Sequence, residues 1–189
     1  MPRTDSIYQL PENLPLPVDD GACNHLLGLR LPSIALPVTS GGKVELSSLA
    51  GTTVFYCYPR TGRPDQEMPK GWNEIPGARG CTPQSCAFRD HYDELNTLGA
   101  SVFGLSTQNT GYQQEAAQRL HLPFALLSDG ELQFVSALRL PTFEVGEMTL
   151  IKRLTLIVRD GRIVKVFYPV FPPDQNAQQV INWLSRNPA

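Results

Sequence analysis

The sequence predicts an α/β fold in which one mixed central sheet carries helices on both faces. Three observations lead to this expectation. Strand-like and helix-like segments alternate along the chain, starting with a strand at residues 52–59. Two later strand-like runs flank Asp160-Gly161, a dipeptide that strongly favours a β-hairpin. A final helical segment at residues 176–186 closes the chain. Strand–helix–strand units followed by a hairpin and a helix are typical of such a sheet.

The length and the first forty residues define the expected domain organisation. A chain of 189 residues, 41% of them hydrophobic, is long enough for one well-buried core, so we expect a single domain over residues 1–189. Residues 1–40 are rich in proline, which disfavours helix and indicates an extended N-terminal arm. The sequence shows neither internal repeats nor low-complexity tracts.

The middle of the chain gives the elements in order. Residues 41–49 read as a turn and a short strand, and residues 52–59 form a β-branched and aromatic run that stops at Pro59, typical of a buried strand. Residues 62–77 are a loop by composition. A helix follows, because Phe88, Tyr92, Leu95 and Leu98 fall at helical spacing. The remaining elements are a strand in 99–108, a helix in 112–121, a strand in 123–129 and a helix in 131–140.

Charge and hydropathy exclude several classes of partner. The chain has 16 Lys plus Arg against 18 Asp plus Glu, so it offers no basic stripe for nucleic acid or an anionic membrane. No segment approaches the roughly 20 apolar residues of a membrane span, and the N-terminus lacks the apolar run of a signal peptide. We therefore expect a cytoplasmic protein that binds neither nucleic acid nor membranes.

The four cysteines are the strongest chemical signal: Cys23, Cys57, Cys81 and Cys86. In a reducing compartment they favour catalysis, metal binding or burial over a disulfide scaffold. Zinc is disfavoured because the closest pair has C-x4-C spacing and the three histidines are scattered, so we expect no metal and no cofactor. Cys57 lies in an apolar strand and reads as inert core. Cys23, in the arm, is a candidate exposed thiol and a candidate alternative resolving thiol, although nothing in its local charge indicates activation.

Cys81 is expected at the N-terminus of a helix. Pro83 suits a first helical turn, and Thr82 before it is a suitable N-cap. The unpaired N–H groups and the positive end of the helix dipole at such a position favour a thiolate, and so prepare a nucleophile. The alternative is an inactive surface cysteine in a loop.

Cys86 lies five residues further along the same expected helix. On an ideal helix the two Cα atoms would be about 8.6 Å apart, whereas a disulfide rarely spans more than about 7 Å. A bond between Cys81 and Cys86 therefore requires the first turns of the helix to unwind, so the sequence predicts an element with a helical thiol form and a locally unfolded disulfide form. The alternative is a small buried residue on the core face of the helix.

The segment "GCTPQSCAFRD" resembles the active-site segment of the Q-type peroxiredoxins, also called bacterioferritin comigratory proteins. The resemblance extends to "YPR", "VFGLSTQ", "LPFALLSD" and an Arg-x-Thr-aliphatic strand before "DG". It implies a thioredoxin-like fold and a thiol-dependent peroxidase for hydrogen peroxide and organic hydroperoxides. It also implies that Cys81 is the peroxidatic cysteine, that Cys86 resolves its sulfenic acid as a disulfide, and that thioredoxin or a similar dithiol regenerates the enzyme.

The same resemblance assigns a cation and exposes a departure from the family motif. Arg153 matches the arginine that supports the thiolate, with Arg60 as a second candidate; the alternative for Arg153 is a solvated charge at a strand end. The family motif Pro-x-x-x-Thr-x-x-Cys is absent. "YPRTG" stands earlier, at residues 58–62, so residues 62–77 read as an insertion. If the ends of this insertion close, Pro59 and Thr61 are the candidates to supply the missing groups.

Two other functions compete with a peroxidase. A general thiol–disulfide oxidoreductase would share the fold, but such enzymes typically use C-x-x-C, which the chain lacks. A non-enzymatic redox sensor would use the same disulfide to change a partner surface without turnover. The sequence makes no prediction of oligomeric state.

Overall fold

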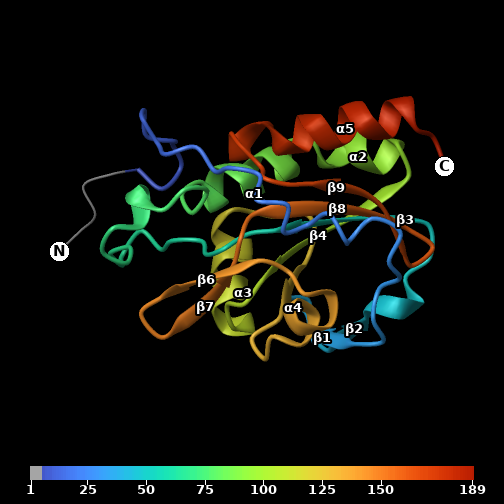
Figure 1. The fold of residues 1–189 in the computed structure, drawn as a ribbon, viewed down its shortest axis with the longest axis horizontal. Coiled ribbons are helices and arrows are strands. Elements are labelled where there is room, and N and C mark those ends of the chain that lie inside the picture. The colour runs from blue at the N-terminus through green and yellow to red at the C-terminus, as the bar shows by residue number, and fades with distance from the viewer. Residues whose placement is uncertain (1–5) are drawn as a thin grey trace.

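A five-stranded mixed sheet forms the centre of the fold, shown in Figure 1 as a computed structural model that describes residues 6–189. Its strands, in spatial order, are β5 (Leu126–Ser128), β4 (Ala100–Ser106), β3 (Thr52–Cys57), β8 (Leu154–Arg159) and β9 (Arg162–Phe167). Strands β3, β4 and β5 run parallel, whereas β8 pairs antiparallel with β3 and β9 pairs antiparallel with β8. The predicted mixed sheet and the hairpin at Asp160-Gly161 are confirmed.

Five α-helices accompany the sheet within residues 6–189: α1 (Cys81–Asp90), α2 (Tyr92–Thr97), α3 (Thr110–Arg119), α4 (Gln133–Leu138) and α5 (Asn176–Arg186). Figure 1 shows α2 and α5 on one side of the sheet and α4 on the other. Helix α3 packs against β5. None of the helices within these residues combines the length and hydropathy that crossing a bilayer requires.

Strand β3 is buried on both faces, which explains its unbroken apolar sequence. Val54 and Tyr56 point into a core shared with α1, α2 and α5, and Phe55 and Cys57 point into a second core shared with α4. All four side chains are inaccessible to solvent. Because the strand is fixed on both sides, the chain that leaves it after Cys57 starts from a rigid position.

Parts of the N-terminal region pack onto the core, while residues such as Leu16 and Val18 are exposed. Its first strand is β1 (Ala35–Pro37), which pairs with β2 (Lys43–Glu45), followed by a 3-10 turn at Leu46–Ser48. Before β1, Leu26 and Leu31 are buried in the same core as Phe55. Cys23 is buried there too, so it is not the exposed thiol for which the sequence left room. The first five residues of the predicted arm lie outside the described residues.

Two other features differ from the sequence prediction. The expected single helix through Leu98 is broken at His91 into α1 and α2. An additional hairpin, β6 (Thr142–Val145) and β7 (Met148–Ile151), turns at Gly146, whose φ is 59°. The loop at residues 62–77 contains only one 3-10 turn, Trp72–Glu74. The unexpected hairpin and this loop pack against each other beside the start of α1, as described below.

Candidate active site

Cys81 is the first residue of α1, as the sequence predicts, but its helix cap differs from the expected one. The N-cap is Gly80, with φ 107°, and Thr82 lies inside the first turn. Glycine is required because the conformation is left-handed and because a Cβ there would collide with Pro173 and lie 2.8 Å from the Leu10 Cδ2 atom. The thiol of Cys81 therefore lies at the positive end of the helix dipole, where negative charge is stabilised.

Three groups contact the Cys81 sulfur, which is only 3% exposed. The backbone N–H of Arg60 donates to Sγ over 3.4 Å, and Nη2 of Arg153 donates over 3.2 Å. As a thiol, Cys81 donates to the carbonyl oxygen of Ala78 at 3.6 Å. The first two contacts are the ones that a thiolate would keep, because both present hydrogens to the sulfur.

Arg153 is a buried cation, 3% exposed, in the link between β7 and β8. Its guanidinium donates to the side-chain oxygen of Gln84 and to the carbonyl oxygens of Gly77 (3.3 Å), Ala78 (3.0 Å) and Arg79 (3.2 Å). Within residues 6–189 it forms no ion pair with a carboxylate. A buried positive charge is costly unless compensated, so Arg153 has an unmatched charge to offer a thiolate.

A buried polar relay that sequence reasoning missed holds Arg153 from behind. Gln84 is fully buried in α1 and donates to Oδ1 of Asn176 at 3.0 Å. The hydroxyl of Thr155 donates to the same oxygen at 2.7 Å. The relay joins α1 to β8 and to the start of α5. No local pattern distinguishes Gln84 from a solvent-exposed helix glutamine, so a single sequence carries no signal for it.

Pro59 and Thr61 follow β3 and lie in the turn that brings Arg60 to Cys81. The ends of the insertion therefore do close. Both the hydroxyl and the N–H of Thr61 donate to Oε1 of Gln108, each over 3.1 Å, and Nε2 of Gln108 returns a bond to the Thr61 carbonyl. Within the described residues no hydrogen bond joins Thr61 to the Cys81 sulfur. Thr61 thus fixes the turn rather than facing the thiol.

The side chain of Arg60 contacts Met148 and Tyr112. Its Nη1 donates to Sδ of Met148 over 3.5 Å, and its guanidinium lies 4.7 Å from the centre of the Tyr112 ring. Among the described residues Arg60 is hydrogen-bonded to the sulfur through its backbone N–H and not through its guanidinium, so its role as a second active-site cation stays a prediction.

Cys86 lies one and a half turns further along α1 and is half-buried. Burial raises the pKa of its thiol. All four cysteines are free thiols. Because α1 is continuous from Cys81 to Asp90, the ideal spacing of about 8.6 Å applies, and a disulfide between Cys81 and Cys86 needs local unwinding.

The other two cysteines lie apart from this arrangement, in the core shared with α4. Burial raises the pKa of Cys23 to about 12 and raises that of Cys57 as well. Both thiols are therefore protonated at neutral pH, which opposes a role as nucleophiles. Within residues 6–189 no three His, Cys, Asp or Glu side chains lie close enough together to hold a metal ion.

Comparison with known proteins decides between the families that such a thiol site permits. A family model described as Redoxin matches residues 26–181. Peroxiredoxin Bcp of Escherichia coli strain K12 is 30% identical over 161 residues, which cover 82% of this chain and 93% of that protein. The chain belongs to the peroxiredoxins. Peroxiredoxin Q from the chloroplast of Populus jackii is also 30% identical, over 83% of this chain and 67% of that longer protein.

Solved structures agree with the fold that the resemblance implied. Peroxidoxin BcpB from Mycobacterium tuberculosis superposes with a TM-score of 0.68 at 23% identity, over 86% of this chain and 98% of that one. Xanthomonas campestris peroxiredoxin Q gives a TM-score of 0.66 at 22% identity, over 84% and 96%. The thioredoxin-like fold is confirmed. As a peroxiredoxin, the protein is a thiol peroxidase. This favours the predicted peroxidase over a general thiol–disulfide oxidoreductase or a non-enzymatic redox sensor.

Proposed function

We propose that Cys81 is the peroxidatic cysteine of this peroxiredoxin, that Cys86 resolves it, and that Arg153 is the cation of the site. The contact that carries the proposal is the 3.2 Å approach of the buried Arg153 guanidinium to the Cys81 sulfur. Substrates are hydrogen peroxide and organic hydroperoxides. The related Xanthomonas campestris bacterioferritin comigratory protein is described as having alkyl peroxide reduction activity.

In the first step the Cys81 thiolate attacks one oxygen of the peroxide. A sulfur–oxygen bond forms, the O–O bond breaks, and the other oxygen takes a proton and leaves as water or an alcohol. Cys81 is thereby oxidised to a sulfenic acid. The Arg60 N–H and the Arg153 guanidinium lie on the sulfur side of this reaction, where they hold the thiolate and stabilise charge on the reacting oxygens.

In the second step the Cys86 sulfur attacks the sulfenic sulfur, and a molecule of water leaves as the disulfide forms. The first turns of α1 must open for the two sulfurs to meet. Opening also returns Cys86 to solvent, which removes the burial that raises its pKa. An outside dithiol then reduces the disulfide by exchange. We propose thioredoxin or a similar dithiol protein for this role, in the cytoplasm, where such reductants keep thiols reduced.

Pro59 and Thr61 act in this proposal as positioning residues. Pro59 is buried at the start of the turn after β3. Thr61 is hydrogen-bonded to Gln108, which lies just after the neighbouring strand β4. Together they hold the Arg60 N–H at 3.4 Å from the Cys81 sulfur. In this chain the proline and threonine of the family motif are separated from the cysteine by the insertion, and Thr61 acts through the turn rather than on the thiol.

Peroxide consumption by cysteine variants, with thioredoxin and its reductase supplied, tests the proposal. Cys81→Ser should abolish turnover. Cys86→Ser should lose turnover but still reduce one equivalent of peroxide per chain, leaving a Cys81 sulfenic acid that a dimedone probe labels. Cys23→Ala, which removes a buried thiol away from the site, is the matched control and should keep turnover. Full turnover in Cys81→Ser would refute the proposal.

A further inference from the structure

The pocket that touches the Cys81 sulfur is very small. It has a volume of about 10 Å³, and its walls include Ile7, Met68 and Trp72. A space of that size is at the lower limit for holding a single water molecule. Hydrogen peroxide, which is little larger than water, needs only a slight displacement of these walls, whereas a peroxide with a branched or aromatic substituent needs one of them to move away.

The walls come from two segments that the family motif does not contain. Trp72 and Met68 belong to the insertion at residues 62–77, and Ile7 belongs to the N-terminal region. The side chains of Ile7 and Trp72 are buried, with 6% and 3% of their surface exposed. Their burial is notable because each lies in a segment without regular strands or α-helices. Tertiary contacts therefore hold them over the thiol.

Contacts with the start of α1 hold the N-terminal wall. Nη2 of Arg79 donates to the carbonyl oxygen of Ser6 over 2.6 Å, next to Ile7. Nη1 of Arg119 donates to the hydroxyl of Tyr8 over 3.4 Å. Leu10 packs directly on Gly80, the N-cap residue of the Cys81 helix. Residues 6–10 thus lie on the helix start that bears the thiol.

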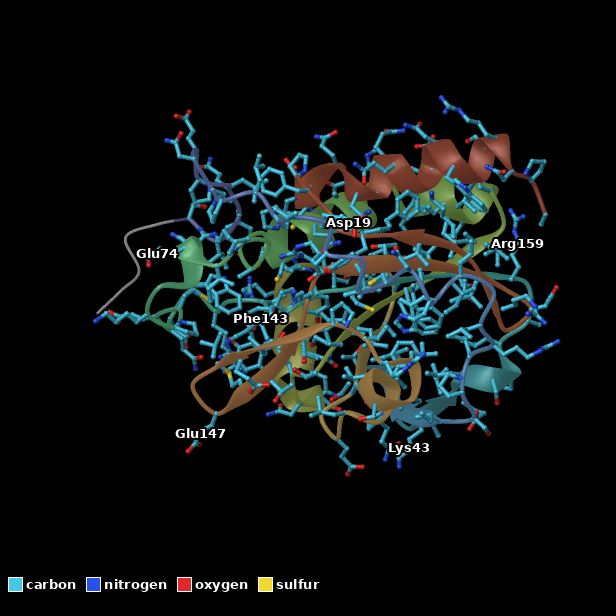
Figure 2. The ribbon with its side chains drawn as sticks, in the orientation of Figure 1. Asp19, Lys43, Glu74, Phe143, Glu147 and Arg159 are labelled. Carbon is cyan, nitrogen blue, oxygen red and sulfur yellow. The ribbon has the colours of Figure 1, made fainter. Side chains whose placement is uncertain are left out.

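The hairpin β6–β7 holds the insertion wall. Trp72 forms a buried cluster with Ala78 and Leu150, and its ring centre lies 6.2 Å from that of Phe143. Figure 2 shows Phe143 and Glu74 on the same side of the molecule, where the insertion lies beside the hairpin. Because the β6–β7 hairpin holds the Trp72 side chain in place, this wall of the pocket resists displacement.

A second, larger cavity has a volume of about 380 Å³, and Cys81 does not line it. Arg60 lines both spaces, and its guanidinium is held between Met148 and the Tyr112 ring. Because Cys81 does not line the larger cavity, a bulky group bound there does not contact the thiol.

We infer that Ile7 and Trp72 determine substrate size in this peroxiredoxin, admitting hydrogen peroxide readily and disfavouring bulky hydroperoxides. The inference rests on the proposed function of Cys81. It narrows the substrate class for this chain, since a bulky hydroperoxide reacts only when one of these walls moves.

The test is the second-order rate constant for single-turnover oxidation of Cys81, measured by acid quench, alkylation and mass spectrometry. Hydrogen peroxide and cumene hydroperoxide are compared in each protein. The wild type should react at least about tenfold faster with hydrogen peroxide, the scale on which an apolar pocket discriminates by size. In Trp72→Ala and Ile7→Ala this ratio should fall several-fold because the rate with cumene hydroperoxide rises.

Trp183→Ala is the matched control. Trp183 is the other tryptophan of the chain, lies on α5 against Arg159 and is outside the Cys81 pocket, so the ratio should stay at the wild-type value. Circular dichroism checks folding, and Ile7→Ala carries the test if Trp72→Ala does not fold. Equal rates for the two peroxides in the wild type, or an unchanged ratio in the wall variants, would overturn the size filter alone. Failure of hydrogen peroxide to oxidise wild-type Cys81 would overturn the proposed function and this inference together.

Discussion

Replacing Arg153 should slow the oxidation of Cys81 without abolishing it. The guanidinium of Arg153 makes one charge-assisted contact with the sulfur, at 3.2 Å, and has no carboxylate partner among the described residues. A hydrogen bond to a charged group contributes about 1.5–3 kcal/mol, so Arg153→Gln should lower the second-order rate constant by about 10- to 150-fold. Arg153→Lys keeps the positive charge but loses the planar set of guanidinium donors. Its rate constant should therefore lie between those of the wild type and Arg153→Gln.

Stability must be measured beside the rate, because Arg153 also bonds to the carbonyl oxygens of Ala78 and Arg79. Single-turnover kinetics with hydrogen peroxide give the rate constant, and urea unfolding shows whether the variant is folded under the assay conditions. Arg159→Gln is the control: it lies at the other end of β8, bonds to the backbone of Asn187 and Pro188, and is labelled in Figure 2. A rate within twofold of the wild type in folded Arg153→Gln, or an equal loss in Arg159→Gln, would refute the reasoning.

Three further variants and conditions probe the supports of the site. Gly80→Ala should lower the urea midpoint, since φ is 107° and the new Cβ meets Pro173 and Leu10, whereas Gly99→Ala, with positive φ but open space, should cost less; equal losses would contradict this account of the helix start. Thr61→Val removes one neutral hydrogen bond to Gln108, about 1 kcal/mol, and should slow Cys81 oxidation roughly fivefold; an unchanged rate would remove Thr61 from the positioning residues. Burial raises the pKa of Cys23 to about 12, so the folded state holds its proton more tightly than the unfolded chain does. The free energy of unfolding should therefore fall as pH rises above about 8.5, and Cys23→Ala should weaken that fall; a parallel profile in the variant would contradict it.

Local patterns in the sequence were sufficient for the elements nearest the chemistry. The β-branched run of β3, the helix that begins at Cys81 and the hairpin at Asp160-Gly161 are each defined by neighbouring residues, so composition and periodicity indicate them. The common helix of Cys81 and Cys86 follows from the same reasoning and already implies unwinding on oxidation.

Contacts between distant segments were beyond such patterns. Gln84 and Asn176 are 92 residues apart, and nothing near either residue indicates that they bond. The burial of Cys23 depends on a core built by α4 and the sheet, although its own surroundings are proline-rich and polar. The cap at Gly80 was missed because Thr82 has the better local capping side chain, whereas close packing by the distant residues Pro173 and Leu10 decides the position.

The insertion at residues 62–77 combines a feature that the sequence predicted with one that it did not. Its composition indicated a loop, and the structure has only a 3-10 turn there. Its apolar residues Met68 and Trp72 pack on the β6–β7 hairpin, which was itself not predicted. A loop that covers the thiol is therefore visible in the sequence only as an interruption of a motif.

The most direct test of the central claim is peptide mapping by mass spectrometry after the fully reduced protein is mixed with one equivalent of hydrogen peroxide. The account predicts rapid loss of two hydrogens, with a disulfide that joins Cys81 to Cys86, and a parallel loss of helical circular dichroism as α1 opens. A bridge from Cys81 to Cys23, or a lasting Cys81 sulfenic acid, would contradict the assignment of Cys86. Survival of all four thiols would contradict the claim that Cys81 is the nucleophile.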